Sequence, residues 1–305
     1  MQSKTAFIEE KAVVNTLSEL IKTYEEVYML KMYRTRNSVL NTREYYKRIF
    51  NLYIDIKSSY KNEILKSIHK VNKDSVFSVL DKPKEHVSVF ISGNDRFAGD
   101  INNKVFKDFL EYFRQNKPNL VVIGQIGKSL MQQRAKTINY QYFDLAEDFG
   151  VSNSKELKPI VDYLILYKDV RVFYGEFENM ISQVPINNSI TGEIGEILEN
   201  ADTNDDKEVK NLKKQEYYLF EPSLINILTF FETQIFTSLF KRAIEESTLA
   251  QIGARVASLE QSTSEIDKKI KQLNYMSLKN NKNIKNKKQQ NILVGINFLK
   301  NQNAW

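Results

Sequence analysis

The residues that break helices are confined to the middle of this chain of 305 residues. All five prolines and eight of the ten glycines lie between Pro83 and Pro222. Residues 1–82 contain neither, and after Pro222 only Gly253 and Gly295 occur. A proline inside a helix costs about 3 kcal/mol and a glycine about 1 kcal/mol. This distribution therefore predicts two long helical regions that flank one globular segment.

The flanks and the segment between them divide the chain into three predicted domains. Residues 1–80 are the N-terminal helical region, residues 81–222 the globular domain, and residues 223–305 a long C-terminal helix. Inside the globular domain, residues 199–215 have almost no apolar side chains, which predicts a solvated loop.

Both flanks repeat apolar residues at alternating steps of three and four, the spacing of a coiled-coil seam. An unpaired seam exposes an apolar stripe to water, so the flanks are predicted to pair with each other as an antiparallel coiled coil. Amphipathic helices packed in a bundle are the alternative. The C-terminal seam consists of Leu249, Ile252, Val256, Leu259, Thr263, Ile266, Ile270 and Leu273. The N-terminal seam consists of Val14, Leu17, Ile21, Tyr24 and Tyr28, and later Tyr45, Ile49, Leu52 and Ile56.

Short β-branched runs alternate with a helical pattern in the globular segment. Residues 86–91 and 120–123 are predicted strands, and residues 102–115 between them are a predicted amphipathic helix. A strand, helix and strand at this spacing form a right-handed parallel unit. The predicted fold class is therefore α/β, with a Rossmann-like domain inserted between the two helices of the coiled coil. Two further strands, predicted around a turn near Gly175, are 169–177 and 179–185.

Composition excludes several kinds of site. The chain has no cysteine, so it has no disulfide, no thiolate nucleophile and no cysteine metal site. Its two histidines, His69 and His86, are too few for most histidine metal sites and are expected to be packed or surface residues. No apolar run reaches the roughly 18 residues of a membrane span. The amino terminus lacks the order of a signal peptide, so a cytoplasmic location is expected.

Positive charge gathers at the end of the chain. The last acidic residue is Asp267, and nine lysines follow from Lys268 onward, in a chain whose formal net charge is +6. This tail is predicted to bind an acidic surface on protein, nucleic acid or lipid. A solvated helix face is the alternative.

Two loops at strand ends have the appearance of ligand sites. Residues 124–129 resemble the end of a phosphate-binding loop, but the required first glycine is replaced by Val122, so a plain strand-to-helix turn is expected. Asp95 and Arg96 follow another strand, where an acid and an anchor would suit an enzyme. A structural turn closed by an Asp–Arg pair is the alternative.

Five segments occur in a characteristic order along the chain. They are residues 92–102, 121–128, 174–185, 221–256 and 292–295. In sequence and in order they resemble the gamma subunit, the central-stalk rotor, of F-type ATP synthases and related rotary ATPases. Phe97 and Ala98 stand where that family has glycine and cysteine. The departures suggest a divergent paralogue, in a synthase or in a specialised motor that is not a proton-driven synthase.

The resemblance implies a non-catalytic shaft. Its partners would be alpha- and beta-type ATPase ring subunits, with an epsilon-like subunit and a membrane ring or a replacement for it. Nucleotide and Mg²⁺ would be bound by the partner subunits, so no catalytic, cofactor or metal residue is expected here. Neither nucleic acid nor direct membrane insertion is expected. The complex would lie at the inner face of the cell membrane.

The resemblance also implies roles for particular residues, including the family turn at Asp95 and Arg96. The apolar end of the last helix would be a tip bearing, made by Ile292, Leu293, Val294, Ile296, Phe298 and Leu299. The candidates for ring contact are Lys31, Met32, Arg34, Arg36, Arg255, Lys282, Lys285, Lys287, Lys288, Gln289 and Gln290.

Three hypotheses follow, ranked in this order. The first is the rotor. The second is a coiled-coil adaptor with a basic nucleic-acid-binding tail, whose affinity for a duplex would collapse with salt. The third is an enzyme with a ligand at the Asp95–Arg96 turn.

Overall fold

The computed structural model of the protein forms two compact units. One unit contains residues 1–29 and 256–305, and the other contains residues 30–255. The predicted loop at 199–215, the Asp95–Arg96 turn and His69 lie outside the described residues. The described residues are 4–59, 83–94, 99–145, 154–179, 182–192, 221 and 223–302.

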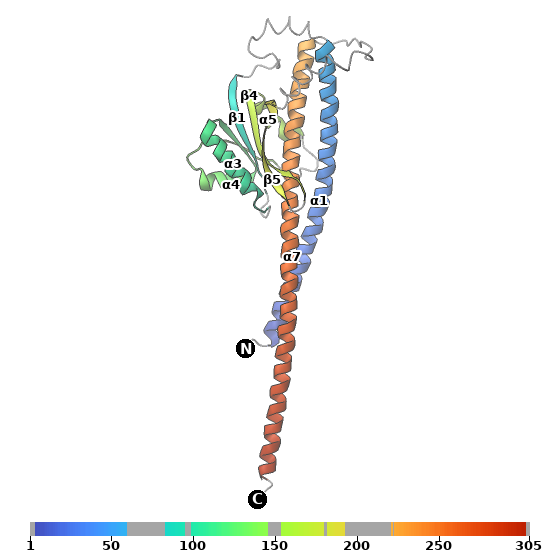
Figure 1. The fold of residues 1–305 in the computed structure, drawn as a ribbon, viewed down its shortest axis with the longest axis vertical. Coiled ribbons are helices and arrows are strands. Elements are labelled where there is room, and N and C mark those ends of the chain that lie inside the picture. The colour runs from blue at the N-terminus through green and yellow to red at the C-terminus, as the bar shows by residue number, and fades with distance from the viewer. Residues whose placement is uncertain are drawn as a thin grey trace. The chain divides into compact units, whose positions relative to one another are not determined.

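Two long helices confirm the helical prediction for both flanks. Helix α1 spans Lys4–Ser59 and helix α7 spans Leu224–Gln302. In the unit of residues 30–255 they run antiparallel, because Ser38 contacts Glu245 and, farther along α1, Tyr53 contacts the earlier Glu232 (Figure 1). The predicted domain boundaries near residues 80 and 222 fall outside the part of the chain that the structure describes.

A sheet of five strands in the order β3-β2-β1-β4-β5 forms the centre of the larger unit (Figure 1). Every neighbouring pair is parallel except β4 and β5, which are antiparallel. The parallel α/β prediction is therefore confirmed. The strands are β1 (Lys84–Ile91), β2 (Asn119–Ile123), β3 (Gln141–Phe143), β4 (Tyr167–Phe177) and β5 (Gln183–Ser189).

The turn predicted near Gly175 is wrong. Gly175 lies inside β4, where it pairs with Pro185, and the chain reverses between Phe177 and Gln183. The glycine allows Ile101 to pack closely on the strand, because a Cβ at this position would lie 2.6 Å from Cγ1 of Ile101.

Helices cover both faces of the sheet. One face packs on α3 (Ile101–Asn116) and α4 (Gln125–Arg134), through a cluster that includes Phe90, Phe106 and Met131. The other face packs on α5 (Ser154–Leu164), α1 and α7. Successive side chains of a strand point to opposite faces of the sheet, and helices cover both faces here. In β1, Val89 therefore belongs to one buried cluster and the adjacent Phe90 to the other.

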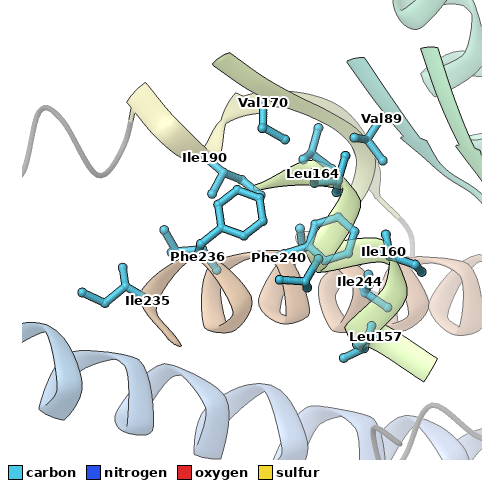
Figure 2. Close-up of a cluster of buried hydrophobic side chains, with 14 of the residues drawn as sticks. Val89, Leu157, Ile160, Leu164, Val170, Ile190, Ile235, Phe236, Phe240 and Ile244 are labelled. Atoms are coloured by element: carbon cyan, nitrogen blue, oxygen red, sulfur yellow. The ribbon is translucent and has the colours of Figure 1, made fainter. Parts of the chain in front are cut away.

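The apolar cluster on the face that packs on α5, α1 and α7 holds the sheet against the long helices. Phe236 and Phe240 of α7 stack with ring centroids 6.4 Å apart, and Ile160 and Leu164 of α5 lie near the Phe240 ring (Figure 2). Phe240 and Leu164 are fully buried. On this face the buried residues of α7 lie between Leu228 and Ile244, and buried residues of α1 and α5 complete the cluster.

The seam of α7 follows the predicted spacing. In the larger unit Leu249 and Ile252 are buried. In the smaller unit Val256 and Leu273 are buried. Between them the predicted positions Leu259, Thr263, Ile266 and Ile270 are half-buried, as are Ala257 and Ser262.

The seam predicted for α1 needs correction. Leu17 and Tyr24 are 47% and 52% exposed, whereas Val14, Ser18 and Ile21 are half-buried or buried. The helix has two adjacent apolar stripes, and the predicted seam mixed them. The seam of residues 4–29 consists of Phe7, Glu10, Val14, Ser18, Ile21, Glu25 and Tyr28.

The same error affects the later part of α1. Tyr45 and Leu52 were expected in the seam, but they are 52% and 39% exposed. Their neighbours Tyr46 and Tyr53 take the inward positions, and Tyr53 is only 1% exposed. Ile49 and Ile56 pack inward as expected.

Candidate functional site

In the larger unit, α7 makes close contacts with one edge of the sheet. In open α/β sheets the carboxyl ends of parallel strands form the crevice where ligands bind. Here the Gln251 side chain of α7 lies against Gly93, which follows β1. Farther along, Gly253 leaves room for the Phe177 ring, whose Cε2 would lie 2.6 Å from a Cβ on that glycine. Helix α7 therefore lies against this edge of the sheet, with the Gln251 side chain beside Gly93 and the Phe177 ring packed on Gly253.

The turn that resembles a phosphate loop is closed by its own neighbours. The N–H of Gly127 donates to Ser92 Oγ at 2.7 Å, and the N–H of Gln125 donates to Asn94 Oδ1 at 2.8 Å. Between them, the N–H of Ile126 donates to a backbone carbonyl at 3.0 Å. These three N–H groups begin α4 and are the ones a phosphate would need. The turn joins strand to helix, as the sequence predicts.

Glu246 is the centre of a buried polar node. It lies on α7, is only 4% exposed, and its Oε1 accepts a hydrogen bond from Arg43 Nη2 of α1 at 2.8 Å. Its Oε2 accepts one from the Tyr174 hydroxyl of β4 at 3.2 Å. Arg242, one turn earlier on α7, adds an ion pair at 3.4 Å. Burial, and then the charge of Glu246, raise the pKa of Tyr174, so this phenol remains a donor at neutral pH.

Two more carboxylates of α7 bind α1. Glu245 Oε1 accepts the Ser38 hydroxyl at 2.6 Å, and Glu232 Oε1 accepts the Tyr53 hydroxyl at 3.0 Å. Both carboxylates are buried, with 1% and 8% of their surface exposed. Burial, and then Glu232, raise the pKa of Tyr53. Sequence reasoning missed these contacts, although charged residues inside an otherwise apolar helical run were a signal for them.

Glu176 of β4 lies near the charges of Glu246, Arg43 and Arg242. Burial, and then the charge of Glu246, raise the pKa of this carboxyl above its ordinary value, while Arg43 and Arg242 partly oppose the shift. A folded-state pKa above the unfolded one means that the ionised form weakens the fold. Stability linked to Glu176 is therefore present at acid pH and is lost as pH rises through the folded-state pKa.

Glu176→Gln should raise the melting temperature at neutral pH, because the amide removes an unfavourable charge. The gain should disappear below about pH 4, where the wild-type carboxyl is protonated in both states. Melting curves by circular dichroism at both pH values measure the effect. The exposed Glu111→Gln on α3 is the control and should change little at either pH. A gain of the same size at both pH values would contradict the assignment.

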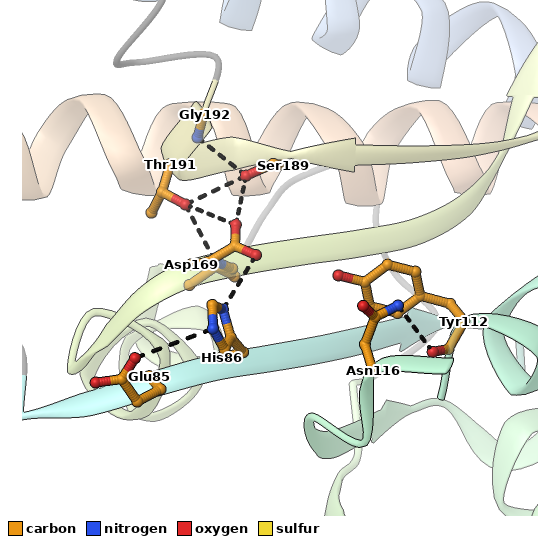
Figure 3. Close-up of polar contacts among 9 residues, drawn as sticks. Glu85, His86, Tyr112, Asn116, Asp169, Ser189, Thr191 and Gly192 are labelled. Carbon is orange, nitrogen blue, oxygen red and sulfur yellow. Dashed lines mark hydrogen bonds and ion pairs between the residues drawn. The ribbon is translucent and has the colours of Figure 1, made fainter. Parts of the chain in front are cut away.

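A second polar cluster ties the end of β5 to β4 (Figure 3). Asp169 Oδ1 accepts the Ser189 hydroxyl at 2.6 Å, and Asp169 Oδ2 lies 3.5 Å from His86 Nδ1. Ser189 Oγ also accepts the Gly192 N–H at 3.0 Å. Because the carboxylate, and not the imidazole, holds the hydroxyl, the arrangement does not activate a nucleophile. His86 is a surface residue in a structural contact.

No metal centre or membrane helix was found in the residues that the structure describes. Among them, no three side chains of the His, Cys, Asp or Glu types gather as metal ligands would. In the same residues, no helix has the length and apolar character needed to cross a membrane.

Most of the expected ring-contact residues are exposed. Lys31, Arg34 and Arg36 on α1 face outward, whereas Met32 is half-buried. Arg255 is only 7% exposed, so little of its side chain is accessible in this chain, and its contact with a ring stays a prediction. The exposed candidates on α7 are Lys282, Lys285, Lys287, Lys288, Gln289 and Gln290.

The expected tip bearing is also exposed. Ile292, Leu293, Val294 and Ile296 are 62%, 60%, 66% and 45% exposed. The side chains of Phe298 and Leu299 are not among those described.

A further apolar stripe on α1 was not recognised as separate from the seam. Its members recur at steps of three and four in residues 13–27 and are 43% to 60% exposed. They are Val13, Leu17, Leu20, Tyr24 and Val27.

In the larger unit a mostly parallel sheet is fixed to the side of two antiparallel helices. The family model described as ATP synthase matches residues 9–286. The chain therefore belongs to the ATP synthase family.

Relatives over most of the chain carry one description. An ATP synthase gamma chain of Cytophaga hutchinsonii is 21% identical over 86% of this chain and 87% of that protein. The ATP synthase gamma chain of Dictyoglomus turgidum is 26% identical over 80% and 81%, respectively. Among solved structures, the central stalk and c-ring of the Tetrahymena thermophila mitochondrial ATP synthase has a similar chain, with a TM-score of 0.54 and 16% identity. That match covers 80% of this chain and 99% of the other, and it shows the fold.

Proposed function

We propose that this chain is the central rotor shaft, the gamma-like subunit, of an F-type or F-type-like rotary ATPase. The observation that carries the proposal is the junction: in a member of the ATP synthase family, a sheet is joined to two long antiparallel helices by close packing and buried polar bonds. A sheet attached in this way moves with the helices as one body. The family match favours this function over a coiled-coil adaptor with a nucleic-acid-binding tail.

The shaft turns inside a ring of alternating alpha- and beta-type subunits that hydrolyse or make ATP. Each orientation of an asymmetric shaft must contact one ring conformer better than the others, since only a difference in contact free energy biases their populations. The exposed apolar stripe on α1 and the exposed tip of α7 supply apolar contact surface. The exposed lysines from Lys279 to Lys288 supply contacts with acidic loops that salt would screen.

The chain itself is non-catalytic, and the partner subunits bind nucleotide and Mg²⁺. The contacts of α7 at the carboxyl edge of the sheet and the bonded N–H groups of α4 support this division of roles. An epsilon-like subunit and a membrane ring, or a replacement for it, are further partners at the sheet end. The complex lies at the inner face of the cell membrane and is either a proton-linked synthase or a specialised motor.

Gentle purification from the native source, followed by single-molecule observation, tests the proposal. Because the chain has no cysteine, Lys107→Cys on the exposed side of α3 provides a unique handle for a bead. We expect alpha- and beta-type subunits to copurify, and the bead to rotate in one direction when ATP is added to the immobilised complex. Copurification of nucleic acid without ring subunits, or a bead that never rotates on an active ring, would contradict it.

A further inference from the structure

A heptad seam does not by itself fix how two helices are aligned. Sliding one helix by seven residues brings equivalent seam positions together again, and buried polar residues are the usual means of selecting one alignment. Among the described residues of the larger unit, polar contacts of this kind join α1 to α7 at three places at least. They are Ser38 with Glu245, Arg43 with Glu246, and Tyr53 with Glu232.

Glu246 also binds the sheet. One oxygen accepts from Arg43 of α1 and the other from Tyr174 of β4. The Arg43 side chain is 50% exposed and reaches the carboxylate from the surface, while the Glu246 side chain is 5% exposed. A shift of α1 along α7 would leave a buried charge without this partner. A rotation of α7 against the sheet would break the bond to Tyr174.

We propose that Glu246, with Arg43 and Tyr174, is a register lock that holds α1, α7 and β4 in one axial and rotational arrangement. Its mechanical role, passing torque between the helices and the sheet without slip, rests on the proposed rotor function. The lock itself is a property of the chain alone. A group that served stability only could be replaced by apolar side chains of similar size without loss of alignment.

Spin-label distances in the full chain test the lock independently of any rotor function. Labels are attached at Lys47→Cys on α1 and Phe230→Cys on α7, both exposed positions. The wild-type background should give one narrow distance distribution. The apolar double variant Arg43→Leu/Glu246→Leu should add a second population. A slip of one heptad displaces the labels by roughly 10 Å, from 1.5 Å rise per residue. The control double variant Glu44→Leu/Arg48→Leu removes an exposed ion pair of α1 and should keep one population.

A milder variant covers the case in which the double variant does not fold. Tyr174→Phe keeps the ring and removes only the hydroxyl that binds Glu246. With labels at Lys47→Cys and Lys168→Cys, it should broaden the distance distribution between α1 and β4. Tyr163→Phe, which removes a hydroxyl bonded to Tyr167 instead, is the matched control and should not. Unchanged distributions in both Tyr174→Phe and the double variant would overturn the lock.

Rotation of the purified complex tests the torque-bearing part. With the bead on Lys107→Cys, the double variant should keep the ATPase rate while the angular fluctuations of a stalled bead at least double. A wild-type complex that does not rotate contradicts the rotor function, whereas the spin-label result still decides the lock. Wild-type rotation with equal fluctuations in the variant would contradict the torque-bearing role.

Discussion

A chain that ends at residue 248 should neither assemble with a ring nor support rotation. The truncation removes the seam from Leu249 onward and, with it, the Gln251 and Gly253 positions at which α7 meets the sheet. Both the smaller unit and the edge of the sheet then lose their partner surface. Copurification of ring subunits with the tagged chain, and bead rotation on any complex that forms, measure the result.

A shorter truncation provides the control. A chain that ends at residue 290 loses the exposed apolar tip, including Ile292 and Leu293, but keeps the buried seam through Leu273. This variant should assemble and hydrolyse ATP with weaker coupling between hydrolysis and rotation. Rotation by the chain that ends at residue 248, or loss of assembly in the longer one, would contradict the assignment of seam and tip.

Phe240→Ala should lower the free energy of unfolding by about 3–5 kcal/mol, the usual cost of deleting a fully buried phenylalanine. Phe240 is 0% exposed and stacks on Phe236 beneath α5, so no water can enter easily to replace it. Urea unfolding followed by circular dichroism measures the change. Phe230→Ala on the same helix is the matched control, because Phe230 is 57% exposed. Its expected cost is below about 1 kcal/mol, and equal costs at the two positions would show that the described core is misplaced.

The sequence predicted the elements whose signals are local and repeated. The long helices follow from flanks that have no proline inside them and only two glycines, and the parallel strands from two β-branched runs followed by glycine. Strand β3 has only three residues, too few for a periodic pattern. Helix α5 contains Pro159, and proline favours helix ends. The burial of the apolar face of α5 against the sheet overrides that preference.

The phase of the α1 seam and the polar node required the structure. Val14 and Leu17 belong to two apolar stripes about a quarter-turn apart, and only contact with α7 determines which is the seam. Ser18 enters the seam although it is polar. Likewise, the pairing of Glu246 with Arg43 and Tyr174 joins residues from three distant parts of the chain, and no local spacing encodes it.

The exposed stripe on α1 has a consequence for how the cell makes this protein. Five apolar side chains at coiled-coil spacing, from Val13 to Val27, face water when the chain is alone. Such surfaces promote association with unintended partners, including further copies of the same chain. Copies synthesised in excess of their partners would therefore be the ones to aggregate or be degraded. The abundance of this chain should thus be set by the supply of whatever covers the stripe, and not by its own rate of synthesis.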